Sequence, residues 1–245
     1  MQFYLALGTE DALPEGSFHT VWAVYRLGGR LLRLSGQQPR GGLMLVGDSG
    51  ECGAPEVLAR DILRECLDRD YRGVVLDWYH TGTDRGALTM QVERLCSQYG
   101  LRLFVPEGYA AHAPRAHLLI NTAVAGGTLK SCLLQAVQRF GAARLAVDLE
   151  RLRLDFTLPL SSRQRRALTA QELRRSMEGK TLYDSHELCA RYFTYRSGSE
   201  NHYVLFDDAD TLRQKAALAE SMGIREGFFM LPEIRDIPQV LTDGG

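Results

Sequence analysis

The sequence predicts an α/β protein in which buried parallel strands alternate with helices. The run Val74-Val75-Leu76 suits a strand that is covered on both faces. The preceding segment, residues 55–70, has apolar residues at helical spacing. The strand then ends abruptly in polar and aromatic residues from Asp77 to His80. Because ligands of such folds bind beyond the carboxyl ends of the strands, we expect a ligand site beside Asp77.

The first forty residues carry mainly strand patterns. Residues 3–7, 20–25 and 31–34 have the composition of strands. The last two flank Gly28-Gly29, which indicates a hairpin as much as a barrel connection. Residues 42–47 predict the next strand. It ends in Gly-Asp-Ser-Gly, which lacks the second glycine of a nucleophilic serine elbow and so does not indicate a serine hydrolase.

Helix and strand patterns alternate in the middle of the chain. Residues 85–99 have apolar side chains at helical spacing. Residues 101–107 predict a strand that places Glu107 and Tyr109 at its polar end. Residues 117–124 predict another strand, which contains Asn121.

A charged segment follows the helix that Thr128 caps, which we expect over residues 129–140. In residues 144–150 apolar and charged side chains alternate. This pattern predicts either one long strand or a strand that continues into a second one. Asp148 and Glu150 fall on one face. This pair fits acid/base chemistry at a strand end, and a solvent-facing ribbon is the more ordinary explanation for it. A loop over 159–166 and a helix over 170–178 are expected next.

Two stretches, Tyr71 to Tyr79 and Tyr183 to Met230, carry a family resemblance. Gly73, Asp77 and Trp78 match the signature strand Asp-Gly-x-Asp-x-Asp-x-Glu of the family 18 glycoside hydrolases, where a tryptophan often stands beside the last aspartate. The second stretch is similar to the closing section of that family. There a Tyr-Asp hairpin and a strand ending in two aspartates lead through a Leu-x-x-Lys helix to the last strand. The resemblance covers most of the chain from about Gly41 onward.

The resemblance implies a chitinase-like (β/α)8 barrel of the TIM-barrel type, as a single domain over residues 1–245. It also implies that Asp77 and Tyr79 point into the C-terminal mouth of the barrel. The family normally has long helices between its first strands, and this chain has Gly28-Gly29 there. We therefore expect the first third of the barrel to be abbreviated or irregular.

Several residues depart from the family pattern. The glutamate that serves the family as general acid is Tyr79, and the other two aspartates are Arg72 and Val75. No Tyr-Asp pair, which grips the N-acetyl group in the family, stands near Asn121. Leu231 takes the place of the tryptophan floor of the sugar site. A phenol with a pKa of about 10 is a poor acid, and losing general acid catalysis typically costs about 10²–10⁴-fold in rate.

Three hypotheses on function follow. The first is a catalytically degenerate, chitinase-like pseudo-enzyme that binds carbohydrate or acts as a scaffold, with Asp77 and Tyr79 as the remnant of the catalytic motif. The second is an active glycoside hydrolase on a glycan that contains N-acetylglucosamine or a related sugar, with relocated acids. The third is a structural component of a bacterial spore or envelope assembly. The candidate substrate-binding residues are Trp78, Glu107, Tyr109, Asn121, Asp148, Glu150 and Leu231.

Composition narrows the range of partners. The 29 Lys and Arg balance the 30 Asp and Glu, so we expect no nucleic acid and no membrane as partner, whereas an oligosaccharide fits the resemblance. The five cysteines are scattered without a Cys-x-x-Cys pair, which indicates reduced thiols and no metal site, and no cofactor is expected. The first apolar run is short for a signal peptide, so a cytoplasmic or intracellular location is expected, with spore association still open. No protein partner is indicated.

Overall fold

A computed structural model describes the chain except for residues 13, 15–17, 35–38, 79–82, 159–164 and 243–245. Eight parallel strands close into a barrel, because each strand pairs with the next and the last pairs with the first. The predicted α/β barrel class is therefore confirmed. In chain order the barrel strands are β1 (Gln2–Leu7), β2 (His19–Arg26), β4 (Leu43–Gly47), β5 (Gly73–Asp77), β6 (Arg102–Pro106), β7 (His117–Asn121), β8 (Leu145–Asp148) and β14 (Glu226–Met230).

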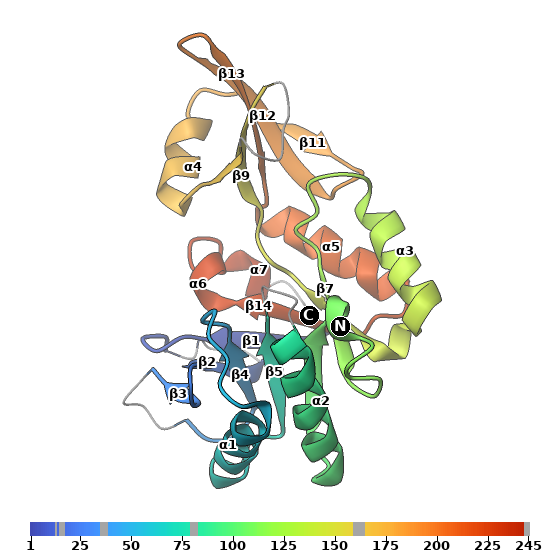
Figure 1. Cartoon of the computed structure of the whole chain (residues 1–245). Helices are drawn as coiled ribbons and strands as arrows, with labels where there is room; N and C mark the ends of the chain where they lie inside the picture. The colour runs from blue at the N-terminus through green and yellow to red at the C-terminus, as the bar shows by residue number, and fades with distance from the viewer. Residues whose placement is uncertain (13, 15–17, 35–38, 79–82, 159–164, 243–245) are drawn as a thin grey trace.

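Helices cover the outside of the barrel (Figure 1). The four long ones are α1 (Pro55–Asp68), α2 (Thr83–Gln98), α3 (Leu129–Phe140) and α5 (Ala209–Ser221). Short turns of helix occur at η1 (Glu107–Tyr109), η2 (Ala142–Arg144), α6 (Leu231–Ile234) and α7 (Gln239–Thr242). The predicted cap of α3 is confirmed, because the Thr128 side chain accepts a hydrogen bond from the backbone N–H of Ser131 at 3.0 Å. None of the helices in the described part of the chain combines the length and the apolar character that crossing a bilayer requires.

Alternation along the strands divides the apolar side chains between two cores. On β5, Val74 and Leu76 face the helices and Val75 faces the barrel interior. The interior is filled by side chains and forms a packed core instead of a pore. It consists of Tyr4, Ala6, Val21, Leu43, Leu45, Val75, Phe104, Ala146 and Phe228.

The first third of the barrel is irregular, as the sequence predicts. No helix occurs in the described residues between β1 and β4. Instead, the short strand β3 (Leu32–Arg33) pairs antiparallel with β2 and is not one of the strands of the closed barrel. The register of β2 against β4 also shifts between Trp22 and Tyr25. The hairpin and the barrel connection are thus both present, because β2 takes part in each.

A second, antiparallel sheet is inserted between β8 and β14 (Figure 1). Its strand order is β10-β9-β13-β12-β11, and α4 (Ala170–Met177) packs on one face. The segment 144–157, left open in the sequence analysis, is therefore two strands in two sheets. The chain leaves the barrel for this sheet and returns for its last strand, and the single-domain boundaries 1–245 stay a prediction. The strands are β9 (Arg153–Thr157), β10 (Arg165–Ala167), β11 (Tyr183–Ser185), β12 (Ala190–Ser197) and β13 (Glu200–Phe206).

A buried ion pair holds the junction between the two sheets. The Lys215 ammonium lies 2.6 Å from a carboxylate oxygen of Asp207, and both side chains are 0% exposed. The same carboxylate accepts hydrogen bonds from the backbone N–H of Leu152 at 2.8 Å and from the Thr211 hydroxyl at 2.9 Å. Asp207 therefore ties the end of β13 to α5 and to the segment that leaves β8. This contact fixes the position of the residues that follow β8.

Candidate functional site

A cavity of about 240 Å³ opens at the C-terminal mouth of the barrel. Its floor is the apolar barrel interior, and its rim carries polar side chains from the strand ends. Most barrel strands contribute at least one residue, as expected where parallel strands converge. The lining residues are Ala6, Leu45, Val75, Asp77, Trp78, Pro106, Leu119, Asn121, Asp148, Glu150, Phe228, Phe229, Met230 and Glu233.

Four carboxyl groups and one amide line this cavity. Asp77 ends β5 and Asp148 ends β8, and both side chains face inward by the alternation of their strands. Asn121 is the register partner of Asp148 on β7, and its side-chain amide donates a hydrogen bond to Glu150. With Trp78, the structure therefore brings five of the predicted site residues to this cavity. Their roles stay predictions.

Asp148 lies at the end of β8, near the other three acids of the mouth. Burial raises the pKa of its carboxyl group to about 8, and the charges of Glu150, Asp77 and Glu233 add to this effect. Among the described residues, none donates a hydrogen bond to this carboxyl group. At neutral pH the Asp148 carboxyl group is therefore largely protonated.

Glu233 is a residue of the cavity that the sequence analysis missed. It lies on α6, directly after the last barrel strand, and no motif singles it out. Burial raises the pKa of its carboxyl group, while Arg151 and Arg153 nearby lower it. The sequence feature that could have identified Glu233 is its position just after a strand that ends at the mouth of the barrel.

Arg151 holds Glu233 in place. Its backbone N–H donates to the Glu233 carboxylate at 3.3 Å, and its guanidinium donates to the Glu233 carbonyl at 3.0 Å. The buried guanidinium also bonds Asp236 at 2.5 Å and the Asp207 carbonyl at 3.1 Å. Arg151 is thus committed to structural contacts, and it fixes α6 against the end of β8.

A second pocket, of about 510 Å³, adjoins the cavity. The two share Asn121, Glu150 and Glu233 as lining residues. The second pocket continues along β9 and β10, where Arg153 and Arg165 line it. The mouth of the barrel therefore extends into a longer groove toward the small sheet, and this shape suits a chain-like ligand.

Trp78 lines the cavity with little of its surface. It is 5% exposed and belongs to the core between the barrel and the helices. Its indole N–H donates to the Thr89 hydroxyl at 3.1 Å, and the Arg85 guanidinium lies 5.7 Å from its ring centroid. Stacking of a sugar on this ring is therefore disfavoured, although Trp78 is a candidate substrate-binding residue, because Thr89 on α2 packs against it. Tyr79, the other half of the degenerate motif, lies outside the described residues.

Three predicted positions need correction. Tyr109 is 2% exposed within the outer core, so its ring is not available to a ligand at the mouth. Glu107 begins η1 and points to Arg139 at 3.9 Å instead of lining the cavity. Leu231 begins α6 and packs on the outer core, while Met230 lines the cavity. The strands β6 and β14 end one residue before Glu107 and Leu231, and Tyr109 lies two residues after Glu107, at the end of η1.

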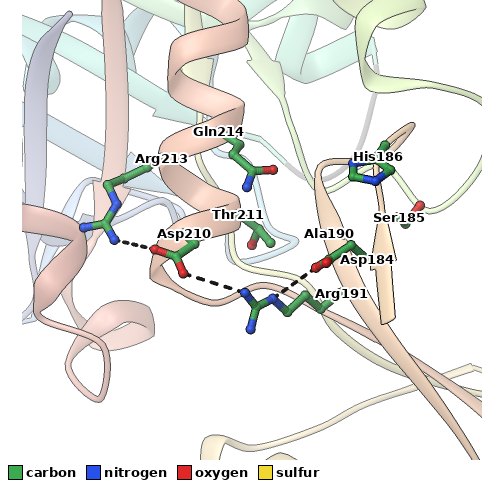
Figure 2. A pocket seen from close by; sticks show the side chains of 9 residues that line it. All are labelled: Asp184, Ser185, His186, Ala190, Arg191, Asp210, Thr211, Arg213 and Gln214. Carbon is green, nitrogen blue, oxygen red and sulfur yellow. Dashed lines mark hydrogen bonds and ion pairs between the residues drawn. The ribbon is translucent and has the colours of Figure 1, made fainter. Parts of the chain in front are cut away.

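A separate pocket lies between α5 and the β11–β12 hairpin (Figure 2). Arg191 extends there between Asp184 at 3.3 Å and Asp210 at 3.7 Å, and it also contacts Asp208 at 3.0 Å. Arg213 pairs with Asp210 at 2.5 Å. Because these charges already neutralise one another, we regard this pocket as a structural junction and the barrel mouth as the candidate site.

The closed barrel of parallel strands has the fold of chitinases and chitinase-like proteins of known structure. The chain is similar to a chitinase from Chromobacterium violaceum, with 14% identity, a TM-score of 0.69 and 100% of both chains covered. It is similar to the spore cortex-lytic enzyme SleL of Bacillus cereus, with 14% identity and a TM-score of 0.69, over 98% of this chain and 72% of that one.

Human YKL-39, a pseudo-chitinase with retained chitooligosaccharide binding properties, is a further structural neighbour. It has 9% identity and a TM-score of 0.64, over 98% of this chain and 97% of that one. No family model and no curated protein matches the sequence. At these identities the likeness establishes the fold, and the fold implied by the sequence resemblance is thereby confirmed.

Proposed function

We propose that this protein is a catalytically degenerate, chitinase-like barrel that binds an oligosaccharide at its C-terminal mouth. The observation that carries the proposal is the open cavity lined by Asp77, Asn121, Asp148, Glu150 and Glu233. Carboxylates accept, and the amide both donates and accepts, the hydrogen bonds that sugar hydroxyls form. A scaffold would need no such cavity, and filling it with apolar side chains would be more stable.

The sequence and the core packing support the loss of catalysis. Tyr79 stands where the family has its general acid. Val75, in place of an aspartate of the motif, is 2% exposed in the barrel interior and offers the cavity an apolar side chain where the motif has a carboxylate. The pseudo-chitinase YKL-39 supports the combination, because its retained chitooligosaccharide binding occurs on the same fold.

The second candidate, an active glycoside hydrolase, is favoured by Asp148. A carboxyl group with a pKa of about 8 is protonated at neutral pH, as a general acid must be. Asp77 lies at the same mouth, and pairs of acids in different environments are typical of glycosidases. In this alternative Asp148 donates the proton to the leaving oxygen.

Calorimetric titration and a hydrolysis assay with chitin oligomers distinguish the candidates. We expect binding by the unmodified protein, no turnover, and binding weakened about tenfold or more by Asp77→Asn. Glu107→Gln, which removes an acid outside the cavity, is the matched control and should bind normally. Turnover that Asp148→Asn abolishes would promote the enzyme. Absence of both binding and turnover would leave the structural role in a spore or envelope assembly.

A further inference from the structure

The groove beside the mouth cavity has an acidic side and a basic side. Glu150 and Glu233 line it where it joins the cavity, and Arg153 and Arg165 line it along the small sheet. A third arginine, Arg151, also lines the groove, but its guanidinium already bonds a carboxylate and two backbone carbonyls. The basic side of the groove is therefore formed by the two arginines of β9 and β10.

The register of β10 against β9 directs Arg165 into this groove. Ala167 is the register partner of Leu154, and both line the groove together with Arg165. Because side chains alternate along a strand, Arg165 and Ala167 share one face of the sheet. Arg166 lies between them and points to the other face, where it pairs with Glu172 on α4 at 2.5 Å. Of these two neighbouring arginines, one has a protein carboxylate and the other faces the groove.

The Arg165 guanidinium has no ion pair and no hydrogen bond within the part of the chain that the structure describes. Arg153 differs, because it lies close enough to Glu233 to lower the pKa of that carboxyl group. β10 is an edge strand, and edge strands commonly carry charges that prevent pairing with other sheets. That role explains a charge on β10, but it does not require the charge to lie in a groove beside a second arginine.

The chemistry of the basic side fits a carboxylate. The planar fork of an arginine can bond both oxygens of a carboxylate. Leu152, Leu154 and Leu168 also line the groove, and attraction between charges is stronger beside such an apolar wall than in open water. Glu150 and Glu233 would repel a doubly charged phosphate more strongly than a singly charged group. A single negative charge therefore suits the groove best.

We propose that the groove recognises a carboxylate carried by the glycan, so that the protein prefers acidic oligosaccharides over neutral ones. This inference rests on the proposed function, that a glycan occupies the mouth of the barrel. A neutral sugar lies in the cavity, and a carboxylate further along the chain pairs with Arg165, while Arg153 adds to the positive potential around it. A neutral oligosaccharide leaves the Arg165 guanidinium to water and gains nothing from it.

The test uses chitin oligomers that carry one carboxylate at one end. The first probe is oxidised to an aldonic acid at the reducing end, and its neutral match is the alditol of the same length. The second probe ends in a uronic acid at the non-reducing end, and the unmodified oligomer is its match. The two probes cover both directions in which the chain can enter the groove.

Calorimetric titration at pH 7, where the carboxyl group of each probe is ionised, measures the affinities. We expect one of the two acidic probes to bind about three- to tenfold more tightly than its neutral match. This range lies between the effect of an exposed ion pair and that of a hydrogen bond to a charged group. The gain should shrink as sodium chloride is raised, since salt screens exposed charges.

Arg165→Gln is the diagnostic variant, because it removes the charge and keeps a polar side chain. The ratio between the affinities for the acidic probe and its neutral match should fall close to one. Arg165→Lys keeps the charge without the planar fork and should retain part of the gain. Arg166→Gln, at the next position but on the opposite face, is the matched control and should keep all of it. Thermal unfolding of each variant checks that the fold is intact.

The outcomes separate this inference from the function on which it rests. Equal binding of acidic and neutral probes, weakened by Asp77→Asn, overturns the carboxylate recognition and leaves the proposed function standing. Failure of every oligomer to bind overturns both. A gain that Arg165→Gln leaves intact also overturns the inference. An oligomer with a sulfate ester at the same end is the last control, and if it binds with an equal gain that Arg165→Gln removes, the groove selects charge alone and the assignment to a carboxylate is wrong.

Discussion

Asp148 shows how one position can serve a site at the expense of the fold. Its carboxyl group is buried at the end of β8, beside the acids Asp77, Glu150 and Glu233. The unfolded chain exposes the same group to water, where its pKa is about 3.9. Between about pH 4 and pH 8 the folded protein therefore keeps a proton that the unfolded chain has already released.

The first prediction is that Asp148 lowers stability as pH rises through this window. Because this group binds more protons in the folded state than in the unfolded state, its contribution to the free energy of unfolding decreases with a limiting slope of about 1.4 kcal/mol per pH unit. Asp148→Asn removes the titrating group, so it should flatten the profile and be more stable than the unmodified protein at pH 7. Chemical denaturation between pH 4 and pH 8 measures this. Parallel profiles for the two proteins would contradict it.

The second prediction concerns the degenerate motif. The unmodified protein should hydrolyse chitin oligomers no faster than a mock preparation, and Tyr79→Glu should not create a good chitinase. Holding the substrate in reactive geometry is worth about 7–11 kcal/mol in the best intramolecular cases, and a restored acid does not supply it. Val75 and Leu231 are packed in cores and offer no grip for a sugar. Release of reducing sugar ends by the variant, abolished by Asp77→Asn, would show the prediction to be wrong.

At this scale the sequence predicts the inward-facing residues well and the turns poorly. Asp77, Asn121 and Asp148 follow from strand alternation, which continues into the last residue of each strand. Glu107 and Leu231 lie one residue beyond a strand, in helical turns where alternation no longer holds. Glu233 reaches the cavity only because α6 folds back against Arg151, and that contact is tertiary.

The junction of α5, β13 and the segment after β8 depends on one buried pair. Lys215 and Asp207 are fully buried, and three further groups of the junction bond to the same carboxylate or to its backbone. Such a pair is weak evidence for added stability in itself. Removing one partner is costly, because the other charge is then buried alone.

The third prediction is that Lys215→Met destabilises the fold by about 3–5 kcal/mol, since it leaves the Asp207 carboxylate without its cation. Lys130→Met, at an exposed lysine on α3, is the matched control and should change the free energy of unfolding by less than about 0.5 kcal/mol. Urea denaturation of the three proteins provides the comparison. Similar midpoints for both variants would refute the role assigned to the pair.

Most elements, but not their division between two sheets, could be predicted. The helix over residues 129–140 has a clear cap and a clear apolar stripe, and the structure agrees with its bounds. Residues 144–157 alternate in the same way in β8 and in β9, so the pattern alone cannot show that the chain changes sheet. The change occurs at Arg151, whose buried contacts come from residues 50 and more positions later in the chain.

Across the whole molecule the two ends of the barrel differ in chemistry. At the C-terminal mouth the acids line an open cavity and lack cations within it among the described lining residues. At the opposite end, Arg102 on β6 bonds both carboxylate oxygens of Glu226 on β14, at 2.8 and 2.7 Å, and the Tyr4 hydroxyl on β1 at 2.6 Å. One end carries acids around an open cavity, and the other carries charges that are paired across the barrel.

The fourth prediction is that substitutions at the N-terminal end of the barrel affect stability, whereas substitutions at the C-terminal mouth affect binding. This is the general rule for such barrels. Arg102→Met should lower the free energy of unfolding by about 1.5–3 kcal/mol, because the Glu226 carboxylate loses its charged hydrogen-bond donor. The same variant should leave oligosaccharide binding unchanged, since Arg102 lies at the end opposite the cavity. Denaturation and calorimetric titration of Arg102→Met and of Asp77→Asn give the change in stability and the change in binding for each variant. If Arg102→Met weakened binding while its stability stayed normal, the ligand would have to occupy the other end of the barrel, where Arg102 also lines a pocket with His19 and Arg72.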